Sequence, residues 1–356
     1  MLSNHSTNYS TNATVINNTI PIFTGALAPE DIKLIATVFF SLVSSLGTVG
    51  NFLVILTLVR WVDMRTPCNI FIANISFTDL IVSLVMAPLR IIEQHTGGWI
   101  FGEVLCFVIA PLQDTLASAS VLSHTAIALE RYRAIVAPFK PRLNKREVKI
   151  SILFIWIGCY LGISFPLLFF VKHELRNGVM TCLASQFPKE DRYIFSLYLV
   201  IVFILVPLVC QVCCYIMVIR ILRRKDAIQD HRESTSTTAE IQIQTFKQRV
   251  RTKKRLIRML VVLILIFQLC YLPRAFIMLI YEFARPLTTH EAFPYVNIST
   301  MLLFYVKHVI NPLVLYCMSK DFRDGFIGLC MCRTLQDFSL QAVPESGKKS
   351  SNKTRL

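Results

Sequence analysis

Charge is what this sequence has least of. Only 17% of its 356 residues are charged, whereas 54% are hydrophobic, and the mean hydropathy is +0.55. This balance excludes an ordinary soluble protein. The eleven cysteines do not supply the two CxxC pairs of a structural zinc site. Because no nucleophile with a neighbouring base and no cluster of metal ligands stands out, we expect neither an enzyme nor a metal or cofactor site.

Positive charge is in excess, but it is not gathered in one patch. The formal net charge is +15 and the pI is about 9.5. Most basic residues lie in short connections between apolar stretches, where they act as topology signals, so we expect no nucleic-acid partner. Residues 1–20 are polar and do not resemble a cleavable signal, which leaves the first apolar stretch to direct insertion.

Seven apolar stretches are each long enough to cross a bilayer. Their ranges are about 33–59, 68–92, 104–136, 148–171, 192–221, 256–283 and 292–317. The third carries its less apolar residues on one helical face. These residues are Gln113, Ala117, Ser120, His124, Ile127 and Arg131. Since such a face would not meet lipid, the pattern predicts an all-α seven-helix membrane bundle with this helix at its centre.

The basic residues also predict the orientation of the chain. The connections 60–67, 131–149 and 220–258 and the tail from Lys320 hold 2, 7, 12 and 7 Lys and Arg residues. The segments on the opposite side hold 1, 0, 4 and 1. By the positive-inside tendency the N-terminus is outside. Four glycosylation sequons agree with this side; they begin at Asn4, Asn8, Asn12 and Asn17.

The expected organisation has four parts. A glycosylated extracellular tail (1–32) precedes the bundle (33–317), which is followed by an amphipathic helix on the membrane surface (318–332) and a cytoplasmic tail (333–356). Two features stay open. Cys330 and Cys332 are either acylated or unmodified, and residues 234–238 are either phosphorylated or a plain solvated linker.

Short motifs occur along the chain in a fixed order and spacing. They are Gly50-Asn51, Asn74, Asp79, Trp99, Cys106, Glu130-Arg131-Tyr132, Trp156, Pro166, Pro207, Tyr215, Phe267, Cys270, Pro273, Asn311-Pro312 and Phe322-Arg323. In these motifs the sequence resembles the rhodopsin-like class of G-protein-coupled receptors, from about residue 33 to residue 330. The resemblance implies a multi-pass plasma-membrane receptor that binds an extracellular ligand and activates a heterotrimeric G protein, with arrestin and a receptor kinase as further partners.

The resemblance also implies roles for particular residues. Glu130 would hold Arg131 in an ion pair until a G protein competes for it. Cys106 and Cys182 would form a disulfide that ties the third helix to the second outer loop. Prolines inside the spans would provide hinges. The coupling and switch residues would be Glu130, Arg131, Tyr132, Tyr215, Asn311 and Pro312, and the hinge prolines Pro207, Pro273 and Pro312.

The sequence of residues 117–142 resembles that of neuropeptide receptors of the neuropeptide Y, neuropeptide FF and RFamide group. Gln113 stands at the position where amine receptors carry an acid, which disfavours a simple amine ligand. Glu282 would pair with an arginine near the amidated end of a peptide, or it is only a charge at the rim. Asp114 and Arg274 either pair with each other or bind opposite ends of a ligand. With Tyr271, these are the expected ligand-binding residues.

Four positions depart from the class pattern. Tyr271 replaces a tryptophan, and Leu315 replaces the tyrosine of NPxxY, which puts the link from that position to Tyr215 in doubt. His124 replaces an aliphatic residue, and it is expected, like His308, to be a neutral core histidine rather than a proton sensor. Lys307 is expected to point towards Asp79 and Ser120 and to supply the positive charge that sodium supplies in the class, or to turn to a neighbouring interface. The expected ion-site core is Asp79, Ser120, His124 and Lys307.

Three rivals remain. A non-signalling decoy or scavenger would keep the fold but couple weakly, as Tyr271 and Leu315 suggest, whereas the intact Glu130-Arg131-Tyr132 argues against it. An opsin would need a lysine where Tyr305 stands. A transporter would show an internal repeat, and none is apparent.

Overall fold

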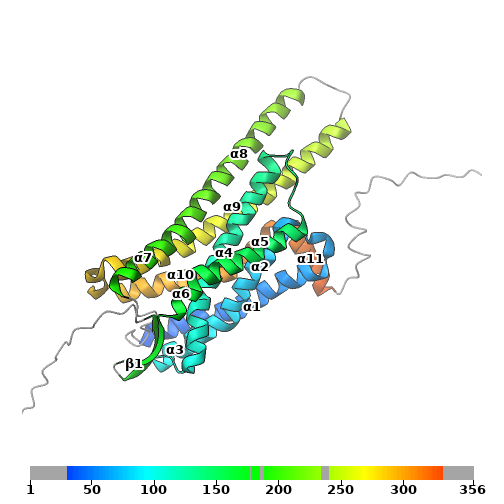
Figure 1. Ribbon diagram of the computed structural model, residues 1–356. Helices are drawn as coiled ribbons and strands as arrows, with labels where there is room; N and C mark the ends of the chain where they lie inside the picture. The colour runs from blue at the N-terminus through cyan, green and yellow to red at the C-terminus, as the bar shows by residue number, and fades with distance from the viewer. Residues whose placement is uncertain (1–29, 177, 185–187, 234–239, 332–356) are drawn as a thin grey trace, which may run out of the picture.

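The computed structural model describes residues 30–331 except 177, 185–187 and 234–239. Its helices lie side by side in an elongated bundle (Figure 1). Seven helical spans within the described residues are long and apolar enough to cross a membrane, as the sequence predicted. They are Ile32–Arg60, Pro67–Thr96, Gly102–Val136, Lys145–Leu168, Glu190–Arg224, Lys254–Phe283 and Phe293–Met318.

Three of the spans are divided by a wide turn of helix. The second is α2 (Pro67–Ile81), η3 (Val82–Met86) and α3 (Ala87–Thr96), the fourth is α5 (Lys145–Cys159), η4 (Tyr160–Ser164) and α6 (Phe165–Leu168), and the fifth is α7 (Lys189–Val200), η5 (Ile201–Leu205) and α8 (Val206–Glu233). Each wide turn is a π-helix that ends two residues before a proline, namely Pro88, Pro166 or Pro207. A proline lacks an N–H and its ring presses on the carbonyl four residues earlier, which explains the widening.

The other spans are continuous helices. They are α1 (Glu30–Arg60), α4 (Gly102–Val136), α9 (Glu240–Phe283) and α10 (Phe293–Met318). Pro273 and Pro312 therefore lie inside unbroken helices, and of the three expected hinge prolines only Pro207 follows a wide turn. Short 3-10 turns, η2 (Val62–Met64) and η6 (Arg285–Thr289), lie in two of the connections.

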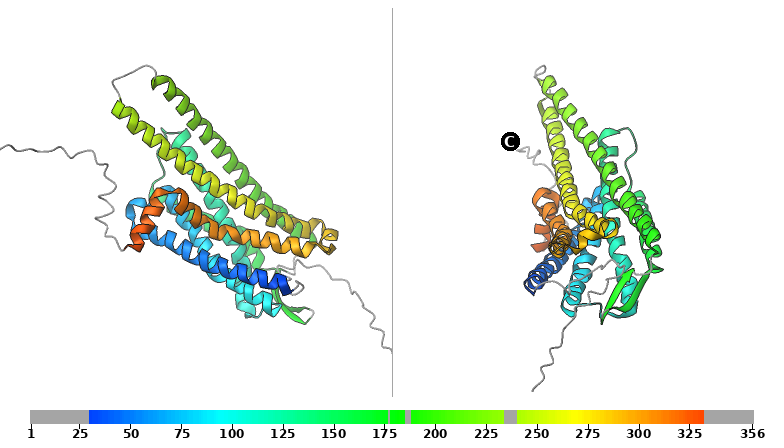
Figure 2. Two further views of the ribbon diagram at one scale, coloured as in Figure 1. Left: turned by 180° about the vertical axis from the view of Figure 1, so that it is seen from behind. Right: turned by 90° about the vertical axis from the view of Figure 1, so that its left-hand side faces the viewer.

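Two helices are much longer than their apolar stretches. α8 and α9 run together beyond the rest of the bundle (Figures 1 and 2). The sequence prediction ended the fifth stretch near 221 and began the sixth near 256, whereas the helices reach Glu233 and begin at Glu240. The added turns are rich in Lys, Arg, Gln and Glu, which are good helix formers and so continue a helix past the membrane.

The fourth span is shifted by three residues against the prediction. Asn144 accepts a hydrogen bond from the Glu147 N–H at 2.8 Å, and the Glu147 carboxylate accepts one from the Asn144 N–H at 2.7 Å. This capping box starts the helix at Lys145. At its other end the chain leaves the helix at Leu168 and enters β1 (Val171–Arg176), which pairs antiparallel with β2 (Val179–Ala184). The predicted end at 171 is therefore wrong.

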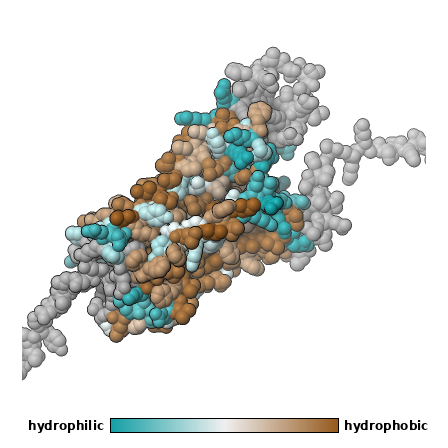
Figure 3. All heavy atoms as spheres, in the orientation of Figure 1, coloured by the Kyte–Doolittle hydropathy of each residue, from teal (hydrophilic) through white to brown (hydrophobic). Residues whose placement is uncertain are grey.

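The bundle is covered by apolar side chains. On the face shown in Figure 3, hydrophobic residues dominate the length of the bundle and hydrophilic residues gather towards its ends. Outward-facing residues such as Leu34, Phe154 and Leu269 are more than half exposed. A water-facing bundle would not carry such a surface, whereas contact with lipid explains it.

A polar layer divides the buried core into two apolar clusters. Along α2 and η3, Asp79 lies between Ile75 of one cluster and Val82 of the other; along α4, His124 lies between Ala119 and Ile127. Asp79 and His124 are both buried. Buried polar groups require partners inside the protein, so this layer is a candidate for function.

A final short helix, α11 (Lys320–Cys330), packs on the end of α1. Ser319 caps it by accepting a hydrogen bond from the Phe322 N–H, and Trp61 donates its indole N–H to the Gly325 carbonyl at 3.1 Å. Phe322 is buried. The predicted amphipathic helix is present, and one side of it packs on Trp61. Cys330 at its end is exposed, whereas Cys332 lies outside the described residues, as do Asn4, Asn8, Asn12, Asn17 and 234–238.

Candidate functional site

Helix α4 places its polar face inside the bundle, as its residue spacing predicted. Ala117, Ser120, His124 and Ile127 are buried, and Gln113 and Arg131 at the two ends are partly exposed. From Asp114 to Arg131 the helix rises about 25 Å at about 1.5 Å per residue. Three arrangements of side chains follow one another along this helix: a cavity, a buried ion-pair layer and an arginine at the far end.

The cavity lies between the N-terminal half of α4 and helices α3, α7, α9 and α10, and its volume is about 210 Å³. Gln113, Asp114, Tyr271 and Arg274 line it, so four of the five predicted ligand-binding residues meet there. Arg90, Glu93, Arg192 and Tyr281 add further polar groups, and Phe195, Phe203, Phe304 and Tyr305 add aromatic ones. A concave, mostly apolar site with a few convergent polar groups is typical of a ligand-binding pocket.

The disulfide between Cys106 and Cys182 joins α4 to the β-hairpin at the mouth of this cavity. Cys182 itself lines the cavity. Trp99, another lining residue, donates its backbone N–H to the Met180 carbonyl of the same hairpin at 2.8 Å. The hairpin is therefore fixed at the cavity by the disulfide and by this hydrogen bond.

Glu282 is not among the residues that line the cavity. It is buried with Arg192, whose Nε donates to the Glu282 carboxylate at 2.8 Å. Glu282 is only 3% exposed, so it is not a charge at the rim of the cavity. The sequence offered no signal for this pair, because its members lie 90 residues apart on different helices.

Asp114 and Arg274 both reach the cavity, but they do not form an ion pair with each other in the described structure. Arg274 donates instead to the side-chain oxygen of Asn297 at 2.6 Å. Arg90, which the sequence analysis did not single out, donates to Glu93 at 2.7 Å and also to the side-chain oxygen of Gln113. Gln113 therefore presents its amide from a fixed position.

The layer below the cavity is centred on Asp79. His308 Nδ1 donates to one carboxylate oxygen of Asp79 at 2.7 Å, and Asn311 Nδ2 donates to the other at 2.6 Å. Lys307 Nζ lies 3.9 Å from the first oxygen. His308 was expected to be a core histidine but was not assigned to Asp79; its spacing of three residues from Asn311, on the same helical face, was an available signal.

Two aromatic rings also lie against the Lys307 ammonium. Its Nζ lies 4.9 Å from the centre of the Phe267 ring and 5.3 Å from that of Phe304, within the range of cation–π contacts. Tyr271, in the cavity wall, stacks on Phe267 with ring centres 5.5 Å apart. The cavity is therefore connected to the ion-pair layer by Phe304, which lines the cavity, and by Phe267, which stacks on the lining residue Tyr271.

His124 and Ser120 complete this layer. The His124 Nδ1–H donates to the Ser120 carbonyl at 2.9 Å, and the His124 ring lies 4.7 Å from the Phe267 ring. The Ser120 hydroxyl is buried without a hydrogen-bond partner among the described residues. No group of three metal-ligating side chains forms a metal site in the part of the chain that the structure describes.

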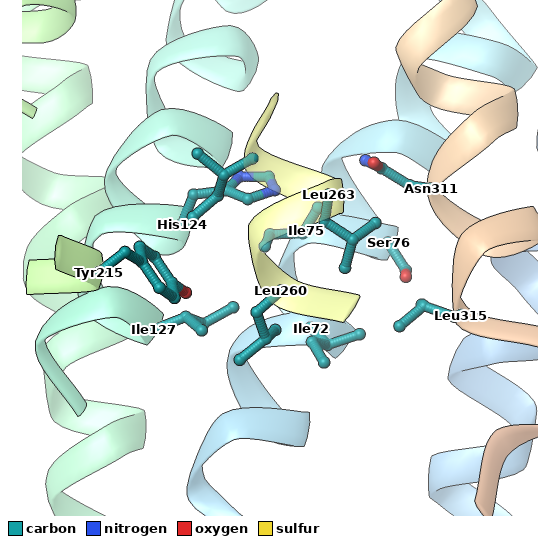
Figure 4. Close-up of a pocket in the computed structure, with 11 residues that line it drawn as sticks. Ile72, Ile75, Ser76, His124, Ile127, Tyr215, Leu260, Leu263, Asn311 and Leu315 are labelled. Carbon is teal, nitrogen blue, oxygen red and sulfur yellow. The ribbon is translucent and has the colours of Figure 1, made fainter. Parts of the chain in front are cut away.

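A small second cavity, of about 20 Å³, lies below His124 (Figure 4). Tyr215 faces Leu315 across it, and the Tyr215 hydroxyl has no hydrogen-bond partner among the described residues. Tyr316, the neighbour of Leu315, points to α1 and donates to the Gly50 carbonyl at 3.3 Å. The tyrosine that follows the class position is therefore turned away from Tyr215.

Arg131 lies at the far end of α4 and donates to the carboxylate of the adjacent Glu130, which is buried. Tyr132, the third residue of the motif, is partly buried against the apolar cluster that contains Ile127. The pair, in which the carboxylate balances the guanidinium, lies at the end of α4 away from the large cavity.

Comparisons with known proteins agree with these arrangements. Residues 50–316 match the family of 7 transmembrane receptors (rhodopsin family). The QRFP-like peptide receptor of Branchiostoma floridae is 24% identical over 322 residues, which cover 88% of this chain and 82% of that one. The substance-K receptor of Rattus norvegicus is 28% identical over 298 residues (83% and 73%), and the neuromedin-U receptor 2 of Mus musculus is 27% identical over 317 residues (83% and 75%).

Among solved structures, the crystal structure of squid rhodopsin is similar in fold. The TM-score is 0.74 at 20% sequence identity, over 91% of this chain and 95% of that one. The position of an opsin lysine is occupied here by Tyr305, which is buried. The match of the family to three quarters of the sequence, together with the seven spans, shows that the chain belongs to the rhodopsin family of 7 transmembrane receptors and is not an enzyme.

Proposed function

We propose that the chain is a plasma-membrane receptor that binds an extracellular peptide in the large cavity and activates a heterotrimeric G protein at the Arg131 end. The observation that carries this proposal is that the cavity and the Glu130–Arg131 pair lie at opposite ends of one buried helix, α4. The names of its relatives, which are peptide receptors, support a peptide rather than a small amine.

The proposed route between the two ends runs through the ion-pair layer. A ligand that displaces Tyr271 moves Phe267, the ring that contacts both Lys307 and His124. Buried rings and ion pairs have few alternative packings. We therefore expect the shift of Phe267 to move α9 and α10 into a second distinct arrangement, and not to be absorbed by small continuous adjustments. Release of Arg131 from Glu130 then offers a guanidinium to the G protein.

The proposed orientation places the N-terminus and its sequons outside and α11 inside. Arrestin and a receptor kinase are proposed as further partners of the inner face, and Cys330, exposed at the end of α11, as an acylation site together with Cys332. Epitope tags at each end, probed on intact and on permeabilised cells, test the orientation. An N-terminal tag that antibodies reach only after permeabilisation would contradict it.

The test of the function is a screen of peptides on cells that express the chain. Binding of labelled peptide is measured in parallel with nucleotide exchange on G proteins. We expect a peptide that binds and that stimulates exchange, and we expect Arg131→Gln to abolish the exchange while binding remains. Peptide binding would then measure the function of the cavity, and nucleotide exchange would measure the function of the Arg131 end.

A second candidate is a decoy receptor that binds and internalises peptide without coupling. One observation favours it: Leu315 offers no hydroxyl to Tyr215, whose own hydroxyl lacks a partner within the described structure. Uptake of a bound peptide with no exchange on any G protein would select this candidate. Exchange that depends on Arg131 would exclude it.

A further inference from the structure

Five charged side chains line the large cavity, and their pairing inside the protein is unequal. They are Arg90, Glu93, Asp114, Arg192 and Arg274. Arg90 is bonded to Glu93 at 2.7 Å, and Arg192 to Glu282 at 2.8 Å. In these two pairs the charges are compensated by the protein itself.

Arg274 and Asp114 are different. The only side chain bonded to Arg274 among the described residues is Asn297, a neutral amide, so no carboxylate there balances its guanidinium. Asp114 forms no hydrogen bond and no ion pair within the part of the chain that the structure describes. The two residues stand on separate walls of the cavity, on α9 and α4, and no ion pair joins them within the described residues.

An uncompensated charge at the depth of a membrane protein is costly, and a ligand that supplies the opposite charge recovers that cost. A ligand with one charge would satisfy one of the two residues and leave the other without a partner. We infer that the part of the ligand that enters the cavity carries two opposite charges, a cation bound by Asp114 and a carboxylate bound by Arg274. This inference rests on the proposed function, since it assigns the chemistry of the peptide that the cavity binds.

Guanidinium is the cation best suited to the Asp114 carboxylate, because its planar fork donates one N–H to each of the two carboxylate oxygens. Aromatic and aliphatic residues around the two charges, among them Phe195, Phe203 and Phe304, accommodate the apolar part of the same segment. We assign these two charges to a terminus of the peptide, where the α-amine or the α-carboxylate lies beside a side chain of the opposite charge. Either a basic residue ends the peptide with a free carboxylate, or an acidic residue begins it with a free amine.

Matched peptide sets test the inference on cells that express the full chain. One set ends in Lys or Arg with a free carboxylate, and its partner set is amidated. Another begins with Asp or Glu with a free amine, and its partner set is acetylated. Peptides with an amidated Arg-Phe end, which carry the cation without the carboxylate, form the contrast.

We expect one unblocked set to bind at least about 30-fold more tightly than its blocked partner. Blocking removes one member of a buried charge pair, and such a loss typically weakens binding by this factor or more. Equal binding of blocked and unblocked peptides, or tightest binding of the amidated Arg-Phe set, overturns the inference while the proposed function stands. If no peptide of any set binds a chain that reaches the cell surface, the proposed function fails as well.

Variants of Asp114 and Arg274 test whether these two residues cause the preference for unblocked peptides. Arg274→Gln should abolish the preference for the free carboxylate, and Asp114→Asn should abolish the preference for the cation, each with a loss of about 30-fold for the preferred peptide. Glu103→Gln, on the exposed first turn of α4, makes the same chemical change outside the cavity and should leave binding unchanged. Surface staining verifies folding, and a preference that survives Arg274→Gln in a chain at the surface overturns the assignment.

Discussion

Lys307 Nζ lies 3.9 Å from the carboxylate of Asp79, and both side chains are completely buried. The Lys307 ammonium has no hydrogen-bond partner among the described residues, so the Asp79 charge and the rings of Phe267 and Phe304 are what stabilise it. Asp79 is supported more fully, by His308 and Asn311. An ion pair of this kind depends on both members, because either charge alone is expensive to bury.

The first prediction concerns this dependence. Lys307→Met or Asp79→Asn should each destabilise the folded receptor by about 3 to 5 kcal/mol, since each leaves one buried charge without its partner. The double variant should lose much less than the two losses added together. Thermal unfolding in detergent micelles measures all three, and additive losses would show that the two residues do not act as a pair.

A second prediction concerns sodium. With Lys307 supplying the positive charge beside Asp79, agonist affinity and thermal stability should be the same in sodium chloride as in choline chloride at equal ionic strength. The Lys307→Met variant removes that charge and should become sensitive to sodium, because a free cation then compensates Asp79. A clear sodium effect on the unaltered chain would count against the assignment.

A third prediction tests how α11 docks on α1. A Cβ atom at Gly325 would lie 2.7 Å from the Thr57 side chain and 3.2 Å from Trp61, so Gly325→Ala should destabilise the docked helix by about 1 to 3 kcal/mol. In α5, a Cβ at Gly158 would meet nothing within 4 Å, and Gly158→Ala should be neutral or stabilising. Tryptophan fluorescence of the two variants during thermal unfolding measures the difference; equal behaviour would contradict the close packing.

A fourth prediction concerns resting activity. Glu130→Gln replaces the charged acceptor of Arg131, and a charge-assisted hydrogen bond of this kind is worth about 1.5 to 3 kcal/mol. The population with a released Arg131 should rise about tenfold or more, and with it the nucleotide exchange without ligand. Glu103→Gln serves as the control on the same helix. Unchanged resting exchange in Glu130→Gln would mean that the pair does not restrain coupling.

Much of the fold was readable from the chain. Apolar length predicted the seven spans, and helical spacing predicted the buried polar face from Gln113 to Arg131, because both depend on local periodicity alone. Helix ends were less predictable where they depend on capping or on proline. Asn144 starts α5 three residues early, and the prolines at 88, 166 and 207 each follow a widened turn.

The partners of the charged residues could not be predicted from the sequence, because they depend on how the helices pack in three dimensions. Glu282 was expected to meet a ligand or the solvent, yet it meets Arg192, which is 90 residues away. Asp114 and Arg274 could have met each other, but Asn297 occupies the guanidinium instead. Such choices depend on differences of a few ångströms between helices, which spacing along one helix does not encode.

The sequence by itself therefore determined that this is a seven-span membrane protein with a polar central helix, since hydrophobic length and helical period are properties of single segments. Only the tertiary structure decided which charges are compensated within the protein and which face the cavity uncompensated. The physical reason is that burial and ion pairing depend on several helices at once. Asp79, Lys307 and His308 meet only after α2 and α10 have packed.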